Sequence, residues 1–243
     1  IKPDETYEDA FRGFIDRLLR ASEGETFRRD LETFARRVAH YGRINGLAQT
    51  LIKFTAPGVP DLYQGGELWD LSLVDPDNRR PVDFTRRMEM LATVRTEGER
   101  DPLALARACL ASPEDGRVKM WLVHGMLLAR RGQPALWREG AYLPLEAAGR
   151  HAGRLLAFAR RHGDHWALSV APRLTVPLVK EGEYPLGAGV WSDTAVRLPK
   201  NAPQRWRHLL TGEILAAGDL LPAADLLHRL PIGVWLSDGT ATT

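Results

Sequence analysis

The spacing of the apolar residues changes about halfway along this chain, and this change constrains the fold more than any other feature. Up to about residue 131 of 243, apolar residues recur at steps of three and four, as on one face of an α-helix. After about residue 136 they alternate with polar residues in short runs that glycine and proline separate, which is typical of antiparallel strands. The sequence therefore predicts an α+β chain with a helical part, residues 1–135, and an antiparallel β-sandwich domain, residues 136–243.

Several helices are predicted in the first part. The first begins at Asp4 or Thr6, whose side chains can cap a helix, and ends at Glu23-Gly24. Apolar residues at helical spacing predict two more helices, over residues 27–41 and 44–54. The same spacing predicts later helices over residues 85–97, 102–110 and 117–131.

A β-hairpin is predicted in the second part. Extended runs over residues 154–161 and 165–171 flank His162-Gly163-Asp164, a turn-forming sequence. His162 and His165 lie across this turn with no further ligand pattern nearby, so no metal site is predicted. Further extended runs are predicted over residues 189–198, 205–211 and 226–236. Most tryptophans stand at helix or strand spacing and are predicted to be core residues: Trp121, Trp137, Trp166, Trp191, Trp206 and Trp235.

A long polar loop follows a sharp break in the first part. Pro57-Gly58 interrupts the helical pattern, residues 59–63 are predicted to form a short strand, and residues 65–82 are irregular. Long loops after a strand tend to carry function. This loop combines aromatic side chains, which stack on sugar rings, with amides, carboxylates and guanidinium groups, which bind hydroxyls. It is therefore the candidate site, and its composition favours a carbohydrate ligand.

The sequence of this loop also resembles a known family. Residues 57–67, PGVPDLYQGGE, resemble the last barrel strand and the following turn of the alpha-amylase superfamily. Residues 69–83, WDLSLVDPDNRRPVD, are similar to the maltooligosyl trehalose synthase branch of that superfamily. Weaker similarity extends over residues 117–145 and 209–213. The resemblance implies the C-terminal end of a (β/α)8 barrel with extra helices, followed by the sandwich domain.

The resemblance implies an intramolecular transglucosylase, an isomerase of trehalose biosynthesis. Such an enzyme converts the reducing-end α-1,4 bond of a maltooligosaccharide into an α,α-1,1 bond by the retaining route, which uses two carboxyl groups about 5 Å apart. In this superfamily the reacting carboxylates lie on earlier barrel strands, and no motif of this chain matches them. No catalytic residue is therefore assigned here. The N-terminal remainder of the same enzyme is the expected partner, no cofactor is expected, and this chain alone is expected to be inactive.

The expected substrate-binding residues lie between positions 63 and 80. They are Tyr63, Gln64, Glu67, Trp69, Asp75, Asn78, Arg79 and Arg80. Tyr63 can face either the site or a barrel core, and Trp69 can either stack on a sugar or fill a gap beneath the loop. Arg79 and Arg80 can also pair with the loop aspartates or with Glu67 and keep the loop rigid.

Composition excludes other classes of function. The net charge is only +2, and the arginines of residues 28–37 alternate with acidic residues, so nucleic-acid binding is not predicted. No stretch approaches the roughly 20 apolar residues that cross a bilayer, so no membrane is expected. The single cysteine, Cys109, stands in an apolar run, which predicts a packed, inert thiol and is compatible with a cytoplasmic location.

Two other functions are compatible with the sequence. One is another hydrolase or mutase of the same superfamily, because the motif over residues 63–67 is shared more widely. The other is a noncatalytic carbohydrate-binding or structural module formed by residues 136–243. A module of that kind would carry a row of exposed aromatic residues on one sheet face.

Overall fold

The computed structural model of the chain describes residues 3–238 and divides the chain into two compact units at Gly42. The first unit contains helix α1 (Glu5–Arg20), the short 3-10 helix η1 (Ser22–Gly24) and the beginning of helix α2 (Glu25–Thr55). Asp4 caps α1 because its side chain accepts the N–H of Tyr7 at 3.1 Å. The predicted start of this helix is thereby confirmed.

The turn between α1 and α2 is tight. The Nη1 of Arg28 donates to the carbonyl of Ala21 at 2.6 Å, next to the end of α1. A Cβ atom on Gly24 would lie 2.0 Å from the carbonyl oxygen of Leu18, so only glycine fits at this position. The prediction that Glu23-Gly24 ends the first helical segment agrees with this geometry.

The prediction of two separate helices over residues 27–41 and 44–54 is wrong. The structure has one continuous helix there, α2, of 31 residues. Gly42 lies between the two apolar stretches, and an interior glycine costs a helix only about 1 kcal/mol relative to alanine. That penalty is too small to interrupt a helix of this length.

The second unit begins with α2 and continues with α3 (Phe84–Arg100), α4 (Pro102–Ala111), α5 (Arg117–Gly132) and α6 (Pro134–Arg138). The side chains of Asp83 and Asp101 cap α3 and α4 by accepting backbone N–H groups at 2.9 Å. The predicted helices over residues 85–97, 102–110 and 117–131 are confirmed. Short 3-10 helices occur at η2 (Asp77–Arg79), η3 (Pro113–Asp115) and η4 (Ala152–Arg154).

Two antiparallel sheets follow the helices. The larger has the order β1-β3-β4-β9-β6-β7, and the smaller has the order β2-β5-β8. The large sheet contains β1 (Ala141–Pro144), β3 (Leu155–His162), β4 (His165–Pro172), β6 (Arg205–His208), β7 (Ile214–Ala216) and β9 (Gly233–Ser237). The small sheet contains β2 (Ala147–Ala148), β5 (Ala195–Arg197) and β8 (Leu220–Pro222), and short helices α7 (Gly187–Trp191) and α8 (Ala223–Leu226) lie nearby in the sequence.

The predicted hairpin is confirmed, because β3 and β4 pair antiparallel with His162 opposite His165. The extended runs predicted over 189–198 and 226–236 are only partly correct. The run over 189–198 begins within helix α7 and is a strand only at β5. The run over 226–236 begins at the last residue of helix α8 and is a strand only from the start of β9. Strands β5, β6 and β9 are only three to five residues long.

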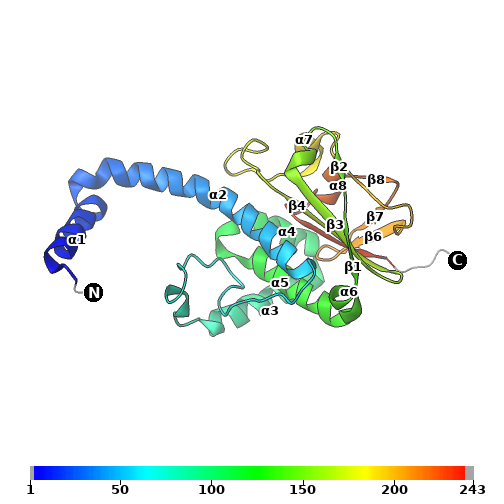
Figure 1. Cartoon of the computed structure of the whole chain (residues 1–243), viewed down its shortest axis with the longest axis horizontal. Coiled ribbons are helices and arrows are strands. Elements are labelled where there is room, and N and C mark those ends of the chain that lie inside the picture. The colour runs from blue at the N-terminus through cyan, green and yellow to red at the C-terminus, as the bar shows by residue number, and fades with distance from the viewer. Residues whose placement is uncertain (1–2, 239–243) are drawn as a thin grey trace. The chain divides into compact units, whose positions relative to one another are not determined.

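Strand β4 is buried on both faces and separates two apolar cores. Ala167 and Ala171 contribute to a core with helices α2 to α6, whereas Leu168 and Val170 contribute to a core with the small sheet. Figure 1 shows α3, α4 and α5 on one side of the strands. The helical layer therefore covers one face of the large sheet, and the small sheet shares a core with the other. The six tryptophans predicted for the core are buried: Trp121, Trp137, Trp166, Trp191, Trp206 and Trp235.

The α+β class is confirmed, but the predicted strand over residues 59–63 is wrong for the structure of this chain. These residues follow α2 without forming a strand, and Val59 is 94% exposed. A strand needs neighbours for its backbone N–H and C=O groups, and no described strand lies beside this segment.

The division into domains at residues 135 and 136 stays a prediction, and residues on both sides of it share the helix-side core.

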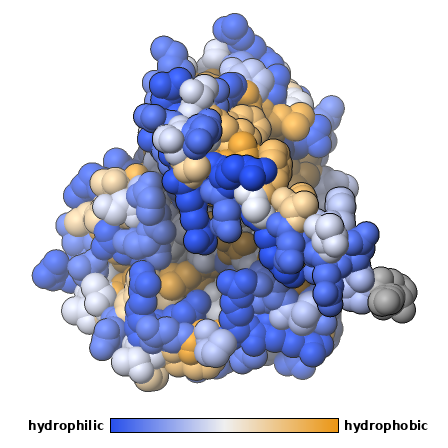
Figure 2. All heavy atoms as spheres, turned by 90° about the vertical axis from the view of Figure 1, so that its left-hand side faces the viewer, coloured by the Kyte–Doolittle hydropathy of each residue, from blue (hydrophilic) through white to orange (hydrophobic). Residues whose placement is uncertain are grey.

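Apolar residues of the first unit remain unburied. No residue of α1 is buried. On its polar side, Glu8 and Asp9 pair with Arg12. Several large apolar side chains of this unit are at least 43% exposed: Tyr7, Phe11, Phe14, Leu19, Phe27, Leu31, Phe34 and Val38. The face of the molecule drawn in Figure 2 also carries apolar areas between hydrophilic ones. Monomeric proteins seldom leave so many large apolar residues exposed together.

Candidate functional site

The polar loop encloses a pocket of about 510 Å³. Both ends of the loop and the first turn of α3 contribute to its wall. The lining residues are Gln64, Gly65, Trp69, Asp70, Leu71, Ser72, Asp77, Asn78, Arg80, Pro81, Val82, Asp83 and Arg87. The volume and the mixture of one large aromatic ring with many polar groups suit a small polar ligand.

Ion pairs within the loop hold its tip. The guanidinium group of Arg79 contacts Asp75 through two hydrogen bonds, Nε to Oδ1 at 2.5 Å and Nη2 to Oδ2 at 2.9 Å. Arg80 pairs with Asp77 through its Nη2. Asp77 also accepts the backbone N–H of Leu73 at 2.7 Å. The predicted pairing of Arg79 and Arg80 with the loop aspartates is therefore confirmed.

Two pocket aspartates are held in their charged form. Hydrogen bonds from the hydroxyl and the backbone N–H of Ser72 lower the pKa of Asp70. The N–H of Leu73 and the side chain of Arg80 lower the pKa of Asp77. A general acid in glycoside chemistry needs a raised pKa, so these carboxylates are unsuited to that task.

Trp69 lies under the loop and in the pocket wall at once. Its indole N–H donates to the carbonyl of Pro113 at 2.7 Å, and a Cβ atom on Gly46 would lie 3.1 Å from its ring. The Nζ of Lys119 lies 5.6 Å from the ring centroid and donates to the carbonyl of Leu68 at 2.8 Å. The two interpretations of Trp69 are thus compatible, because the fixed ring supports the loop and still borders the pocket.

The structure places four of the eight expected residues in the pocket wall: Gln64, Trp69, Asn78 and Arg80. The other four lie outside it: Tyr63, Glu67, Asp75 and Arg79. Tyr63 is 45% exposed rather than packed into a core. Asp75 and Arg79 pair with each other at the loop tip, so their contribution is to the shape of the loop.

Arg87 is a pocket residue that sequence reasoning missed. It lies on α3, and its guanidinium group binds Glu67 through Nε at 3.1 Å and the carbonyl of Gly65 through Nη2 at 3.0 Å. Asp70, Ser72, Leu71, Pro81, Val82 and Asp83 also line the pocket and were not expected to bind substrate. The sequence feature that could have indicated Arg87 is its position in the first turn of the helix that follows the loop.

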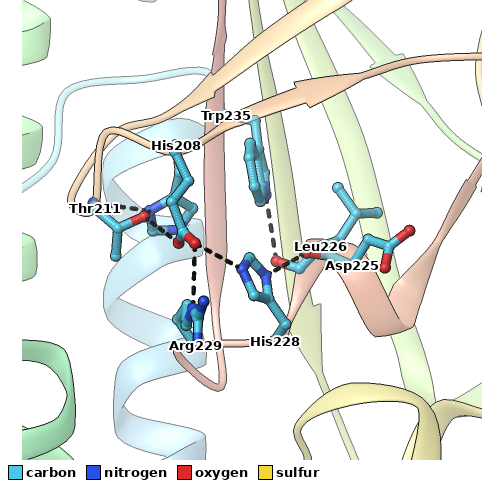
Figure 3. Close-up of polar contacts among 8 residues, drawn as sticks. His208, Thr211, Asp225, Leu226, His228, Arg229 and Trp235 are labelled. Carbon is cyan, nitrogen blue, oxygen red and sulfur yellow. Dashed lines mark hydrogen bonds and ion pairs between the residues drawn. The ribbon is translucent and has the colours of Figure 1, made fainter. Parts of the chain in front are cut away.

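A second cluster of polar groups lies away from the pocket, in the β-sheet region (Figure 3). Nδ1 of His208 accepts the backbone N–H of Thr211 at 3.1 Å. Glu213 accepts hydrogen bonds from Thr211 at 3.0 Å and from Arg229 at 3.2 Å, and its Oε1 lies 3.0 Å from the Nε2 of His228. His208 is buried against the edge of Trp235, and this burial lowers its pKa to about 4.

The lone cysteine and the two turn histidines do not contribute to the pocket. Burial raises the pKa of the Cys109 thiol to about 12, which confirms a packed, unreactive side chain. His162 and His165 are exposed. Within residues 3–238, no group of three or more His, Cys, Asp or Glu side chains is arranged to hold a metal ion. No helix in the described part of the chain is long and apolar enough to cross a membrane.

Comparison with known proteins supports the resemblance seen in the loop. The chain is 34% identical over 237 residues, 97% of its length, to a Mycobacterium tuberculosis protein named as a proposed maltooligosyl trehalose synthase. It also superposes on the maltooligosyltrehalose synthase of Arthrobacter ramosus with a TM-score of 0.74 and 34% identity. The predicted resemblance to maltooligosyl trehalose synthases is confirmed. No family model matches the chain.

The similarity covers only part of the known maltooligosyl trehalose synthases. The chain spans 26% of the Mycobacterium protein and 27% of the Arthrobacter chain, although 97% of its own residues are matched in each case. Another maltooligosyl trehalose synthase structure shares the fold at 22% identity with a TM-score of 0.64. The chain is thus comparable with about a quarter of a maltooligosyl trehalose synthase.

Proposed function

We propose that this chain provides a sugar-binding wall for an enzyme that converts the reducing-end α-1,4 bond of a maltooligosaccharide into an α,α-1,1 bond. The observation that carries the proposal is the 34% identity over 97% of the chain to proteins named for maltooligosyl trehalose synthesis. The polar pocket beside Trp69 agrees with a carbohydrate substrate. Because the chain spans 26% of the Mycobacterium relative, the reacting carboxylates are assigned to the remaining length of such an enzyme.

The pocket residues have distinct proposed roles. The fixed ring of Trp69 offers a face to a pyranose ring, and Gln64 and Arg80 offer hydrogen bonds to hydroxyl groups. Asn78 also lines the pocket, and its side-chain amide offers a further hydrogen-bonding group to a sugar hydroxyl. Tyr63, Glu67, Asp75 and Arg79 shape or border this wall.

The acidic residues of the loop act in support rather than in the chemical step. Asp75, Asp77 and Glu67 are each paired with an arginine, and hydrogen bonds keep Asp70 charged. We further propose that residues 59–63 become the last strand of a (β/α)8 barrel when the rest of the enzyme supplies neighbouring strands. The two sheets after residue 136 then form the sandwich domain that braces this barrel.

The test uses the full-length protein that contains this sequence, incubated with maltopentaose. Loss of reducing ends without release of shorter sugars supports the proposal, because an α,α-1,1 product has no reducing end. Release of shorter reducing sugars supports the hydrolase alternative, and absence of any conversion contradicts both. The chain of 243 residues by itself is the matched control and is expected to be inactive. Turnover by this chain that a single Asp or Glu substitution abolishes would show that the carboxylates were assigned wrongly.

A further inference from the structure

Arg87 connects two segments that are about 20 residues apart. From the first turn of α3 it reaches the turn at residues 63–67, where Nε donates to Oε2 of Glu67 and Nη2 donates to the carbonyl of Gly65. Its Nη1 donates to the carbonyl of Asp83 at 3.2 Å, within its own helix start. All three nitrogens of one guanidinium group are therefore engaged, each with a different acceptor.

The turn is shaped to receive this side chain. Gly65 has a φ of +90°, a conformation that side-chain-bearing residues rarely adopt. A Cβ atom there would lie 3.2 Å from Val82 and 3.5 Å from Nη2 of Arg87. Gly65 therefore permits both the backbone conformation and the close approach of Val82. The side chain of Arg87 is only 19% exposed, and that of Glu67 is 28% exposed, so this pair is better shielded than the pairs at the loop tip.

The contacts leave one side of the turn available to a ligand. Gln64 and Gly65 lie in the pocket wall, as does Arg87 itself. Oε2 of Glu67, which lies outside the pocket wall, is held by the arginine. The arginine thus fixes the position of the turn without occupying the hydrogen-bonding groups of Gln64.

We propose that Arg87 is a positioning residue for the substrate, which fixes the turn of Gln64 and Gly65 against α3 in the pocket wall. The proposal rests on the proposed function, because it names the element that orients the same pocket. A lysine is a single point charge without a planar fork, so it cannot bind Glu67 and the Gly65 carbonyl together while retaining the geometry. Arg87→Lys therefore keeps the charge and removes the positioning.

The experiment compares the full-length wild type with Arg87→Lys and with Arg86→Lys, a neighbouring exposed arginine outside the pocket wall. Maltopentaose affinity is measured by calorimetry, kcat and KM by loss of reducing ends, and Tm by thermal unfolding. Arg87→Lys is expected to weaken maltopentaose binding and to lower kcat/KM by roughly 10- to 100-fold, chiefly through KM, because misplaced contacts misalign the sugar. Arg86→Lys is expected to leave all four quantities unchanged.

A purely structural role gives a different result. If Arg87→Lys lowers Tm while affinity, KM and kcat stay at wild-type values below the unfolding temperature, the inference is overturned. If the wild-type protein binds and hydrolyses maltopentaose, the proposed isomerisation is refuted, but the affinities of wild type and Arg87→Lys can still be compared. Failure of the proposed function is therefore distinguishable from failure of the role proposed for Arg87. Wild-type protein that neither binds nor converts maltopentaose overturns both.

Discussion

Nη1 of Arg160 donates to the carbonyl of Thr55 at 3.1 Å and so joins strand β3 to the end of helix α2, 105 residues earlier in the chain. The same guanidinium group donates to the carbonyls of Trp137 at 3.2 Å and Gly140 at 2.7 Å. Arg160 is only 1% exposed, and these partners are all backbone carbonyls near helix ends. The negative ends of two helix dipoles thus stabilise a buried cation.

Arg160→Met is expected to destabilise the chain. Methionine matches much of the side-chain volume but leaves the carbonyls of Thr55, Trp137 and Gly140 without their donor, at about 1–3 kcal/mol for each unsatisfied group. Because the buried charge is removed as well, we expect a net loss of roughly 3 kcal/mol in the free energy of unfolding, measured by urea denaturation. Arg161→Met, which alters a more exposed side chain of β3, is the control and is expected to cost less than about 1 kcal/mol. Equal losses in the two variants would contradict this account.

The free energy of unfolding is expected to fall as the pH is lowered from about 6.5 to 4. Burial lowers the pKa of His208 to about 4, whereas the unfolded chain binds this proton near pH 6.5. Between these values the unfolded state binds more protons, so stability is fully present above pH 6.5 and is lost as the pH falls, by roughly 3 kcal/mol. His208→Asn retains an acceptor for the N–H of Thr211 but does not titrate, so its stability profile should be flatter over this window. The exposed His165→Asn is the control, and a flat wild-type profile would refute the prediction.

Arg79→Lys is expected to affect substrate handling more than folding. The pair with Asp75 is exposed on both sides, 66% and 56%, and exposed pairs contribute about 0–1 kcal/mol to stability. Loss of the two parallel hydrogen bonds should nevertheless loosen the loop that carries Asn78 and Arg80. We expect an unchanged Tm and a several-fold higher KM for maltopentaose in the full-length enzyme, with the exposed Arg107→Lys as control. Wild-type kinetics in Arg79→Lys would show that the pair has no functional effect.

The exposed apolar residues of the first unit are expected to be covered in the longer enzyme. Phe34 is 66% exposed, so Phe34→Gln should change the unfolding free energy of the chain alone by no more than about 0.5 kcal/mol. It should also reduce binding of a hydrophobic dye to that chain. In the longer enzyme the same change should cost about 2–3 kcal/mol, because a buried aromatic side chain is lost. Glu32→Gln, an exposed polar change on the same helix, controls for local effects. If Phe34→Gln and Glu32→Gln are equally stable in the longer enzyme, the apolar residues of the first unit stay exposed there.

The sequence by itself determined the features that depend on neighbouring residues. Apolar spacing located α3, α4 and α5, and the turn at Gly163 located the β3–β4 hairpin, because each pattern reports which side of one element is buried. The pairing of Arg79 with Asp75 was also predictable, since the two residues are four apart on one short loop. The family resemblance also rested on neighbouring residues, those of the continuous segments 57–67 and 69–83.

Only the tertiary structure decided the features that depend on distant residues. The local pattern at residues 59–63 is that of a strand, but strand formation needs partners for the backbone, and no described strand supplies them. Gly42 suggests an interruption, yet the helix continues through it because the penalty of one glycine is small. The contacts of Arg87 with Glu67 and of Arg160 with Thr55 join residues 20 and 105 positions apart. No local pattern encodes such contacts, because they form only when separate elements pack and bury the same charged group.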